Sequence, residues 1–214
     1  MRMVLAGLLS VALQGVAAAH PTPPFACAMA STSNGWCDGC RTGYLATVEI
    51  RSAKLFESLD ANGHNVTDPA SMDCVVCRDA FPRNGYCGDC RIGFVGGHAF
   101  FTRLTYLLAR GETRDTSTIS CTSCSRAAAD TTLPLEDVRW CDLCGHGMVG
   151  NVVFRDTFEY AAARKRFERL LRAVRESERC EDCAMALFHG GACRRCDITF
   201  KNGEPLKSKP AAEK

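Results

Sequence analysis

Apolar residues recur at the same spacing in three stretches of the chain, and each stretch follows a pair of cysteines. Counted from the last cysteine of each pair, an aliphatic residue stands five positions on, an apolar residue ten and an aromatic residue sixteen. The three sets are Leu45, Val95 and Val149, then Ile50, Phe100 and Phe154, then Phe56, Tyr106 and Tyr160. Between residues 45 and 59 the apolar positions follow helical spacing rather than alternation. We therefore predict an apolar helix in each stretch.

The ends and faces of these helices can also be predicted. Asn62-Gly63 and Gly111 stand where a left-handed C-cap would end the first two helices. The third helix runs longer. Its apolar face carries Phe167, Leu170, Leu171 and Val174, and its other face carries Arg164, Lys165, Arg166, Arg169 and Arg172. We interpret the basic face as solvated, and the alternative is a docking surface for an acidic partner.

Small residues and turn residues recur between the cysteines and these stretches. Glycine stands three positions after the last cysteine, and a small residue stands six positions after it. These residues are Gly43, Gly93 and Gly147, then Ala46, Gly96 and Gly150. Upstream, Asn34-Gly35, Asn84-Gly85 and Gly190-Gly191 precede a cysteine pair and predict β-hairpins. Trp36, Tyr86 and Trp140 each precede a cysteine, and we expect them to pack over the cysteine loops.

Fourteen of the fifteen cysteines form seven C-x-x-C pairs, and these pairs recur at intervals of 50, 54 and 52 residues. Such a period indicates an array of small units, each needing a metal ion or disulfides for stability. We expect a first repeat at 20–63 with three cysteines, a second at 64–111, and a third at 112–178 with a long connector, Ser125 to Trp140, and a long helix. A fourth repeat at 179–203 lacks its helix, and a disordered tail follows at 204–214.

Each unit is predicted to run from a cysteine knuckle through a β-hairpin and a second knuckle to a helix. This order resembles the treble-clef family of zinc fingers, in which the last two ligands lie at the start of a helix. A zinc ribbon has the same cysteine spacing, but strands follow the second pair. The resemblance implies a fold of small metal-stapled α+β modules in tandem, treble-clef-like, and it covers nearly all of the chain after residue 19.

Four thiolates on two C-x-x-C pairs suit a tetrahedral Zn²⁺ ion, and three complete sets are present. The candidate ligands are Cys74, Cys77, Cys87 and Cys90, then Cys121, Cys124, Cys141 and Cys144, then Cys180, Cys183, Cys193 and Cys196. The first repeat offers only Cys27, Cys37 and Cys40. That repeat either forms a fourth, open metal site, with His20 as a possible fourth ligand, or is a degenerate cap.

Residues 1–19 have the features of an export signal: Arg2, an apolar run from Val4 to Leu13, and Ala17-Ala18-Ala19 before His20. We therefore expect a periplasmic or secreted protein without a membrane span after cleavage. Because exported proteins usually meet oxidising conditions, disulfides are the main alternative to zinc. A dithiol oxidoreductase is a further alternative, although the chain lacks the βαβ pattern of thioredoxin-like enzymes.

The net charge of +2 and the pI near 7.9 argue against nucleic-acid binding, and three Zn–Cys₄ sites would make the folded charge more negative. Paired carboxylates, Ser-His-Asp, phosphate-loop and H-E-x-x-H patterns are absent from the sequence. We therefore predict an exported, non-enzymatic zinc-binding protein that acts as an interaction scaffold for other proteins. The alternatives are an extracytoplasmic metal-delivery protein that uses the three-cysteine site, and a disulfide-stapled or dithiol-redox protein.

Overall fold

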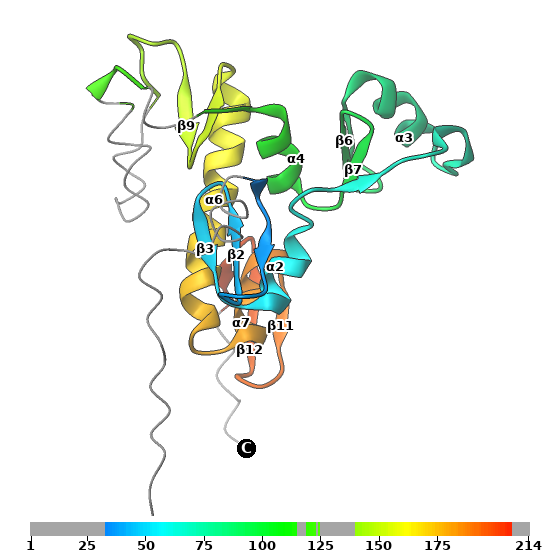
Figure 1. Cartoon of the computed structure of the whole chain (residues 1–214). Helices are drawn as coiled ribbons and strands as arrows, with labels where there is room; N and C mark the ends of the chain where they lie inside the picture. Colours follow the sequence, from blue (N-terminus) through cyan, green and yellow to red (C-terminus); the bar gives the residue numbers. More distant parts are fainter. Residues whose placement is uncertain (1–32, 115–118, 123, 125–139, 207–214) are drawn as a thin grey trace, which may run out of the picture.

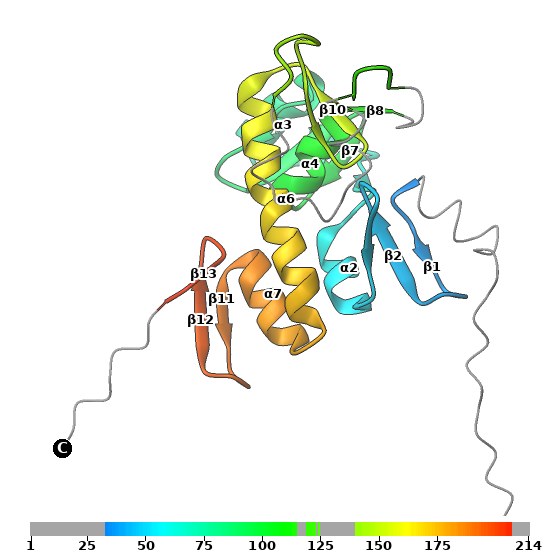
Figure 2. The ribbon, with the colours of Figure 1, turned by 90° about the vertical axis from the view of Figure 1, so that its left-hand side faces the viewer.

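The long helix α6 (Thr157–Ser177) runs through the middle of the molecule, and the part of the chain around α3 (Val75–Ala80), β6 (Ile92–Val95) and β7 (His98–Phe100) projects away from it (Figures 1 and 2). The computed structural model describes residues 33–114, 119–122, 124 and 140–206. We divide this part of the chain into four modules, each built on one sheet: module 1 (33–63), module 2 (64–111), module 3 (112–178) and module 4 (179–206). Figure 2 shows modules 2 and 3 at one end of α6, and modules 1 and 4 on either side of its other end.

Every strand in the described residues pairs antiparallel with its neighbours. Module 1 has the order β1-β2-β3, module 2 the order β4-β7-β6-β5, module 3 the order β8-β10-β9 and module 4 the order β11-β12-β13. The strands are β1 (Trp36–Cys37), β2 (Thr42–Leu45), β3 (Val48–Ile50), β4 (His64–Asn65), β5 (Tyr86–Cys87), β6 (Ile92–Val95), β7 (His98–Phe100), β8 (Glu112–Thr113), β9 (Gly147–Val149), β10 (Val152–Phe154), β11 (Gly191–Cys193), β12 (Ile198–Lys201) and β13 (Glu204–Pro205).

The helices occupy two kinds of position. In modules 2 and 4, α3 (Val75–Ala80) and α7 (Glu181–His189) start at the first cysteine pair. In modules 1 to 3, α2 (Ala53–Leu59), α4 (Arg103–Arg110) and α6 follow the β-hairpin. Two 3₁₀ turns complete module 2, η1 (Pro69–Ser71) and η2 (Phe81–Arg83).

The helices after the hairpins start at equivalent side-chain caps. The N-cap residue lies twelve positions after the last cysteine of its module in all three cases. Ser52 accepts a hydrogen bond from the Leu55 amide, Thr102 from Thr105 and Asp156 from Glu159. Each cap satisfies a backbone N–H group that has no partner within its helix.

The prediction that a helix directly follows the second cysteine pair is wrong. Leu45 ends strand β2 and Val48 begins β3, so this apolar run forms a hairpin and the helix begins only at Ala53. The hairpin closes through the two residues Ala46 and Thr47, whose φ angles of 48° and 73° are typical of a mirror-image turn. The strands expected of a zinc ribbon thus precede the helix expected of a treble clef.

The predicted hairpins at the Asn-Gly pairs are also displaced. Asn84 is the left-handed C-cap of η2, and its side-chain Oδ1 accepts a hydrogen bond from the Gly96 amide at 3.0 Å. Asn34 accepts one from the Ala46 amide at 2.8 Å in the same way. Each asparagine therefore connects the segment before β1 or β5 to the turn between the next two strands, β2–β3 or β6–β7. The hairpin predicted at the Asn-Gly pair lies further on, where β1–β2 and β5–β6 enclose the second cysteine pair.

The predicted position of the helix end is correct for α4, but the predicted left-handed cap is wrong there, and α2 ends earlier than predicted. Helix α2 ends at Asp60, with a φ of 53°, before the predicted Asn62-Gly63. Gly111 does follow α4, but its φ of −76° is an ordinary value rather than a left-handed one.

The recurrent glycines lie against the recurrent aromatic residues. A Cβ atom at Gly43, Gly93 or Gly147 would overlap the ring of Phe56, Tyr106 or Tyr160 in the same module. The aromatic residue before the second cysteine pair packs on the same ring, with centroids 5.5, 5.5 and 5.9 Å apart for Trp36–Phe56, Tyr86–Tyr106 and Trp140–Tyr160. Module 4 has no helix after its sheet in the described residues. It has Ala192 in place of the aromatic residue before the second cysteine pair and Thr199 in place of the glycine.

One apolar core is shared by all four modules. Leu45 and Leu55 of module 1 and Leu104 of module 2 lie in the same buried cluster as Leu170 of module 3 and Leu187 of module 4. Modules 1 and 4 also bond directly, because Ser52 donates a hydrogen bond to Glu181 at 2.7 Å and Lys54 pairs with Asp182. The described modules therefore form one packed body.

Several predictions fall at or beyond the limits of the described residues. The ordered chain continues past 203, because β13 pairs with β12, so the tail predicted from residue 204 begins too early. The signal at 1–19, His20, Cys27, most of the long connector and residues 207–214 lie outside the described residues.

Candidate metal centres

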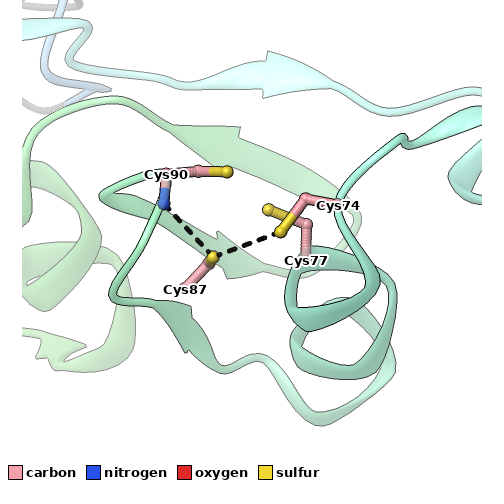
Figure 3. A group of neighbouring side chains, drawn as sticks. All are labelled: Cys74, Cys77, Cys87 and Cys90. Atoms are coloured by element: carbon pink, nitrogen blue, oxygen red, sulfur yellow. Dashed lines mark hydrogen bonds between the residues drawn. The ribbon is translucent and has the colours of Figure 1, made fainter.

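The structure brings together the three complete cysteine sets that the sequence predicts. Within each set, the four sulfur atoms all lie within 4.8 Å of one another. Figure 3 shows Cys74, Cys77, Cys87 and Cys90 of module 2, with their side chains converging from helix α3 and from the turn after β5. The other two sets are Cys121, Cys124, Cys141 and Cys144 in module 3, and Cys180, Cys183, Cys193 and Cys196 in module 4.

The first cysteine pair of each set lies at the start of a helical turn. Cys74 is the N-cap residue of α3 and Cys180 is that of α7, and neither has a side-chain hydrogen bond as its cap. Cys77 and Cys183 lie in the first turns of these helices. Backbone N–H groups without helical partners point outward there, and they stabilise negative charge on the sulfur atoms.

The second pair lies in a tight turn between two strands. Cys87 ends β5 and Cys193 ends β11, while Cys141 forms an isolated β-bridge with His146. The residue after the last cysteine has a positive φ in all four modules: 52° at Arg41, 59° at Arg91, 63° at Gly145 and 53° at Asp197. This turn brings the last cysteine back toward the first pair. In the sequence, only Gly145 among these four residues indicates that the turn needs a positive φ.

The sulfur–sulfur distances match a metal site rather than a disulfide. They are 3.8 Å for Cys74–Cys87, 3.9 Å for Cys121–Cys141 and 3.7 Å for Cys124–Cys144. The Cys180–Cys193 distance is 3.8 Å. A tetrahedron with metal–sulfur bonds of about 2.3 Å has edges of about 3.8 Å, whereas a disulfide bond is about 2.05 Å long.

The first cysteine of each set is the most acidic. The nearby backbone N–H group of Cys77 is the largest influence on Cys74 and lowers its pKa to about 7. The Cys124 amide does the same for Cys121, and the Cys183 amide for Cys180, with each pKa about 7. Burial instead raises the pKa of Cys77, Cys124 and Cys183, the second cysteine of each set. Because the thiolate is the form that binds a metal ion, the lowered pKa of these three first cysteines favours metal binding near neutral pH.

Two of the three cysteine sets pack in small apolar clusters that are separate from the shared core. Cys77 and Cys87 pack with Phe94, and Cys124 packs with Met148 and Val153. The module 4 cysteines Cys180, Cys183 and Cys193 instead belong to the shared core. A metal ion in module 4 would thus bind cysteines of the shared core, whereas the ions in modules 2 and 3 would stabilise local clusters.

The three-cysteine site predicted in module 1 is not assembled from described residues. Cys37 is buried at the end of β1, whereas Cys40 is disulfide-bonded. A disulfide sulfur cannot serve as a thiolate ligand. Of the other predicted ligands, Cys27 and His20 lie outside the described residues.

The histidines of the described residues take part in local contacts rather than in cysteine sets. His64 pairs with Asp60 at 3.0 Å, and His189 lies 2.9 Å from the Ser58 hydroxyl. His98 and His146 contact the carbonyl oxygens of Gly96 and Cys144, each at 3.2 Å. The described residues thus contain three groups able to hold a metal ion, each made of cysteines alone.

The described helices indicate no membrane span, and the comparisons with known proteins give no match. No helix among the described residues combines the length and the apolar character needed to span a membrane. No protein-family model, no curated protein and no solved structure matches this chain.

Proposed function

We propose that the three complete cysteine sets each hold a Zn²⁺ ion and that these ions are structural. The observation that carries this proposal is the set of sulfur–sulfur distances between 3.7 and 3.9 Å across the two pairs of each set. They fit the edge of a zinc–thiolate tetrahedron of about 3.8 Å. Because four protein ligands fill each tetrahedron, no position is open for substrate, as is typical of structural zinc.

In modules 2 and 3, the proposed ions would join segments that otherwise pack only in small local clusters. In module 2, the site links the start of α3 to the turn after β5, and the local buried cluster contains Phe94 as its only large apolar side chain. A cluster of this size offsets little of the entropy lost on folding. The free energy of metal binding would then become part of the free energy of folding of the module.

At the level of the whole protein, we propose an exported, non-enzymatic scaffold that binds other proteins. The signal-like residues 1–19 support export, and the closed sites support a structural role for the metals. The metal-delivery alternative needs three free thiolates in module 1, and the disulfide at Cys40 argues against it. The alternative of disulfides in the other modules conflicts with the sulfur–sulfur distances there.

Native mass spectrometry of the full chain, with and without a reductant, tests the zinc proposal. We expect three Zn²⁺ ions per chain in both conditions, with reduction affecting only the disulfide of Cys40. Cys90→Ser should remove one ion, and Ser33→Ala in module 1 should serve as the control that retains three. A metal-free chain that gains about fourteen hydrogens on reduction would contain disulfides instead.

A further inference from the structure

Three arginine side chains at the junction of α4 and α6 have no carboxylate partner in the described residues. Other arginines nearby are paired: Arg110 with Glu159 at 2.7 Å, Arg164 with Glu168 at 3.3 Å and Arg172 with Glu204 at 2.7 Å. Arg103 at the start of α4 and Arg166 and Arg169 on α6 have no such ion pair. We call these three side chains the arginine cluster.

Arg103 is held in place by aromatic rings rather than by an acidic group. Its guanidinium carbon lies 3.8 Å from the centre of the Tyr86 ring and 5.0 Å from that of Tyr106. Its Nη1 atom is buried and has no hydrogen-bond partner. The Nε and Nη2 atoms of the same guanidinium are not enclosed in this way and have no hydrogen bond in the described residues, so they are the donors that an acceptor from outside can reach.

Arg166 adds positive charge near Arg103, and Arg169, about one turn further along α6 and beside Gly203, adds positive charge near Arg166. Helix α4 packs against α6, and the two helices are adjacent in both views (Figures 1 and 2). Burial lowers the pKa of Arg166, and the positive charges of Arg103 and Arg169 lower it further. Burial and the charge of Arg172 lower the pKa of Arg169, although Glu204 opposes this. Arginine keeps its charge at neutral pH, so these partly buried guanidinium groups repel one another.

The basic face of α6 is only partly solvated, so the interpretation of this face as solvated is wrong for Arg166 and Arg169. Arg166 is partly buried and donates one hydrogen bond to the Ala162 carbonyl at 2.9 Å. Arg164 and Arg172 are each neutralised by a glutamate. Lys165 is exposed, so Arg166 and Arg169 are the partly buried side chains of this face that have no ion pair in the described residues, and Arg166 lies close to Arg103 of module 2.

We propose that the arginine cluster binds a dianionic tetrahedral oxyanion, that is, a phosphate or sulfate group. Guanidinium groups bind such oxyanions through paired N–H donors, and stacking on Tyr86 leaves the edge of Arg103 free to donate. A dianion balances two of the three charges, whereas a single carboxylate would leave two unbalanced. This inference goes beyond the proposed zinc-binding function and does not depend on it.

Isothermal titration calorimetry of the zinc-loaded full chain tests the site, with inorganic phosphate, sulfate and chloride at constant ionic strength as probes. We expect saturable binding of one phosphate or sulfate per chain and no saturable binding of chloride. The ratio of the phosphate and sulfate affinities identifies the preferred group. Arg166→Gln and Arg103→Gln should each weaken binding by about tenfold or more, because each removes charged hydrogen bonds.

Arg175→Gln is the matched control, because Arg175 lies exposed in the last turn of the same helix and the substitution removes the same charge. Its affinity should stay within about twofold of the unsubstituted chain, since an exposed distant charge is screened by salt. Zinc content and circular dichroism, measured on every sample, verify folding. If the Arg103→Gln variant does not fold, the Arg166→Gln variant tests the proposal by itself. Absence of saturable binding, or an equal loss in Arg175→Gln, would overturn the proposal.

Discussion

At the scale of single residues, the fit between a glycine and an aromatic ring explains why several positions recur together. The ring of Tyr106 occupies the space that a side chain at Gly93 would need, and Tyr86 packs on the same ring. The three residues come from β5, β6 and α4, so their contacts hold the helix against the sheet. Changing one of them alone should disturb all three.

Gly93→Ala should destabilise the chain by about 1–3 kcal/mol, because a Cβ atom would overlap the Tyr106 ring in a packed region. Gly88→Ala is the control, since a Cβ atom there would have no neighbour within 4 Å. Urea unfolding of the zinc-loaded proteins measures both effects. Equal stability of the two variants would show that the ring can move aside without cost.

At the scale of elements, the sequence predicts the three helices after the hairpins but not where they start, and it does not predict α3 or α7. Strands β2 and β3 have four and three residues, and apolar runs so short fit either a helix or a hairpin. The two-residue turn that separates them is also inconspicuous in module 1, because Ala46 and Thr47 have positive φ angles without being glycine. The cysteine sets are predicted correctly because the spacing of each pair is local. The arginine cluster is not, because Arg103 and Arg166 lie about sixty residues apart.

The cap of α6 should have a measurable effect, because this helix contacts elements of several modules. Asp156→Ala removes the acceptor of the Glu159 amide, a hydrogen bond of 2.7 Å, and should lower the free energy of unfolding by about 0.5–2 kcal/mol. Asp156→Asn retains a good cap and should keep most of the stability in urea unfolding. If both variants lost the same amount, the charge of Asp156 rather than its cap would be responsible.

At the scale of the whole molecule, the contact between modules 1 and 4 should make stability depend on pH. Burial lowers the pKa of His189, whose Nε2 lies 2.9 Å from the Ser58 hydroxyl. The unfolded chain therefore binds this proton more readily, and the free energy of unfolding falls as the pH drops through about 6.5 and toward the lower folded pKa.

Urea unfolding between pH 7.5 and 6 should show this loss in the zinc-loaded chain and a smaller loss in His189→Gln. Glutamine can still bond Ser58 but does not titrate, so the difference between the two chains isolates the histidine. Zinc content must remain constant across the series, because protons also compete with metal for thiolates. An identical pH dependence in both chains would contradict the prediction.

The contact between the first and last modules also has a consequence for biosynthesis. The Ser52–Glu181 hydrogen bond joins residues 129 positions apart, and Leu55 and Leu59 of α2 lie in the same buried cluster as residues of α7. A ribosome that makes the chain from its N-terminus releases α2 long before α7 exists to cover it. The apolar face of α2 that packs with α7 therefore stays uncovered by α7 until synthesis is nearly complete, and exposed apolar surface of this kind favours aggregation during that time.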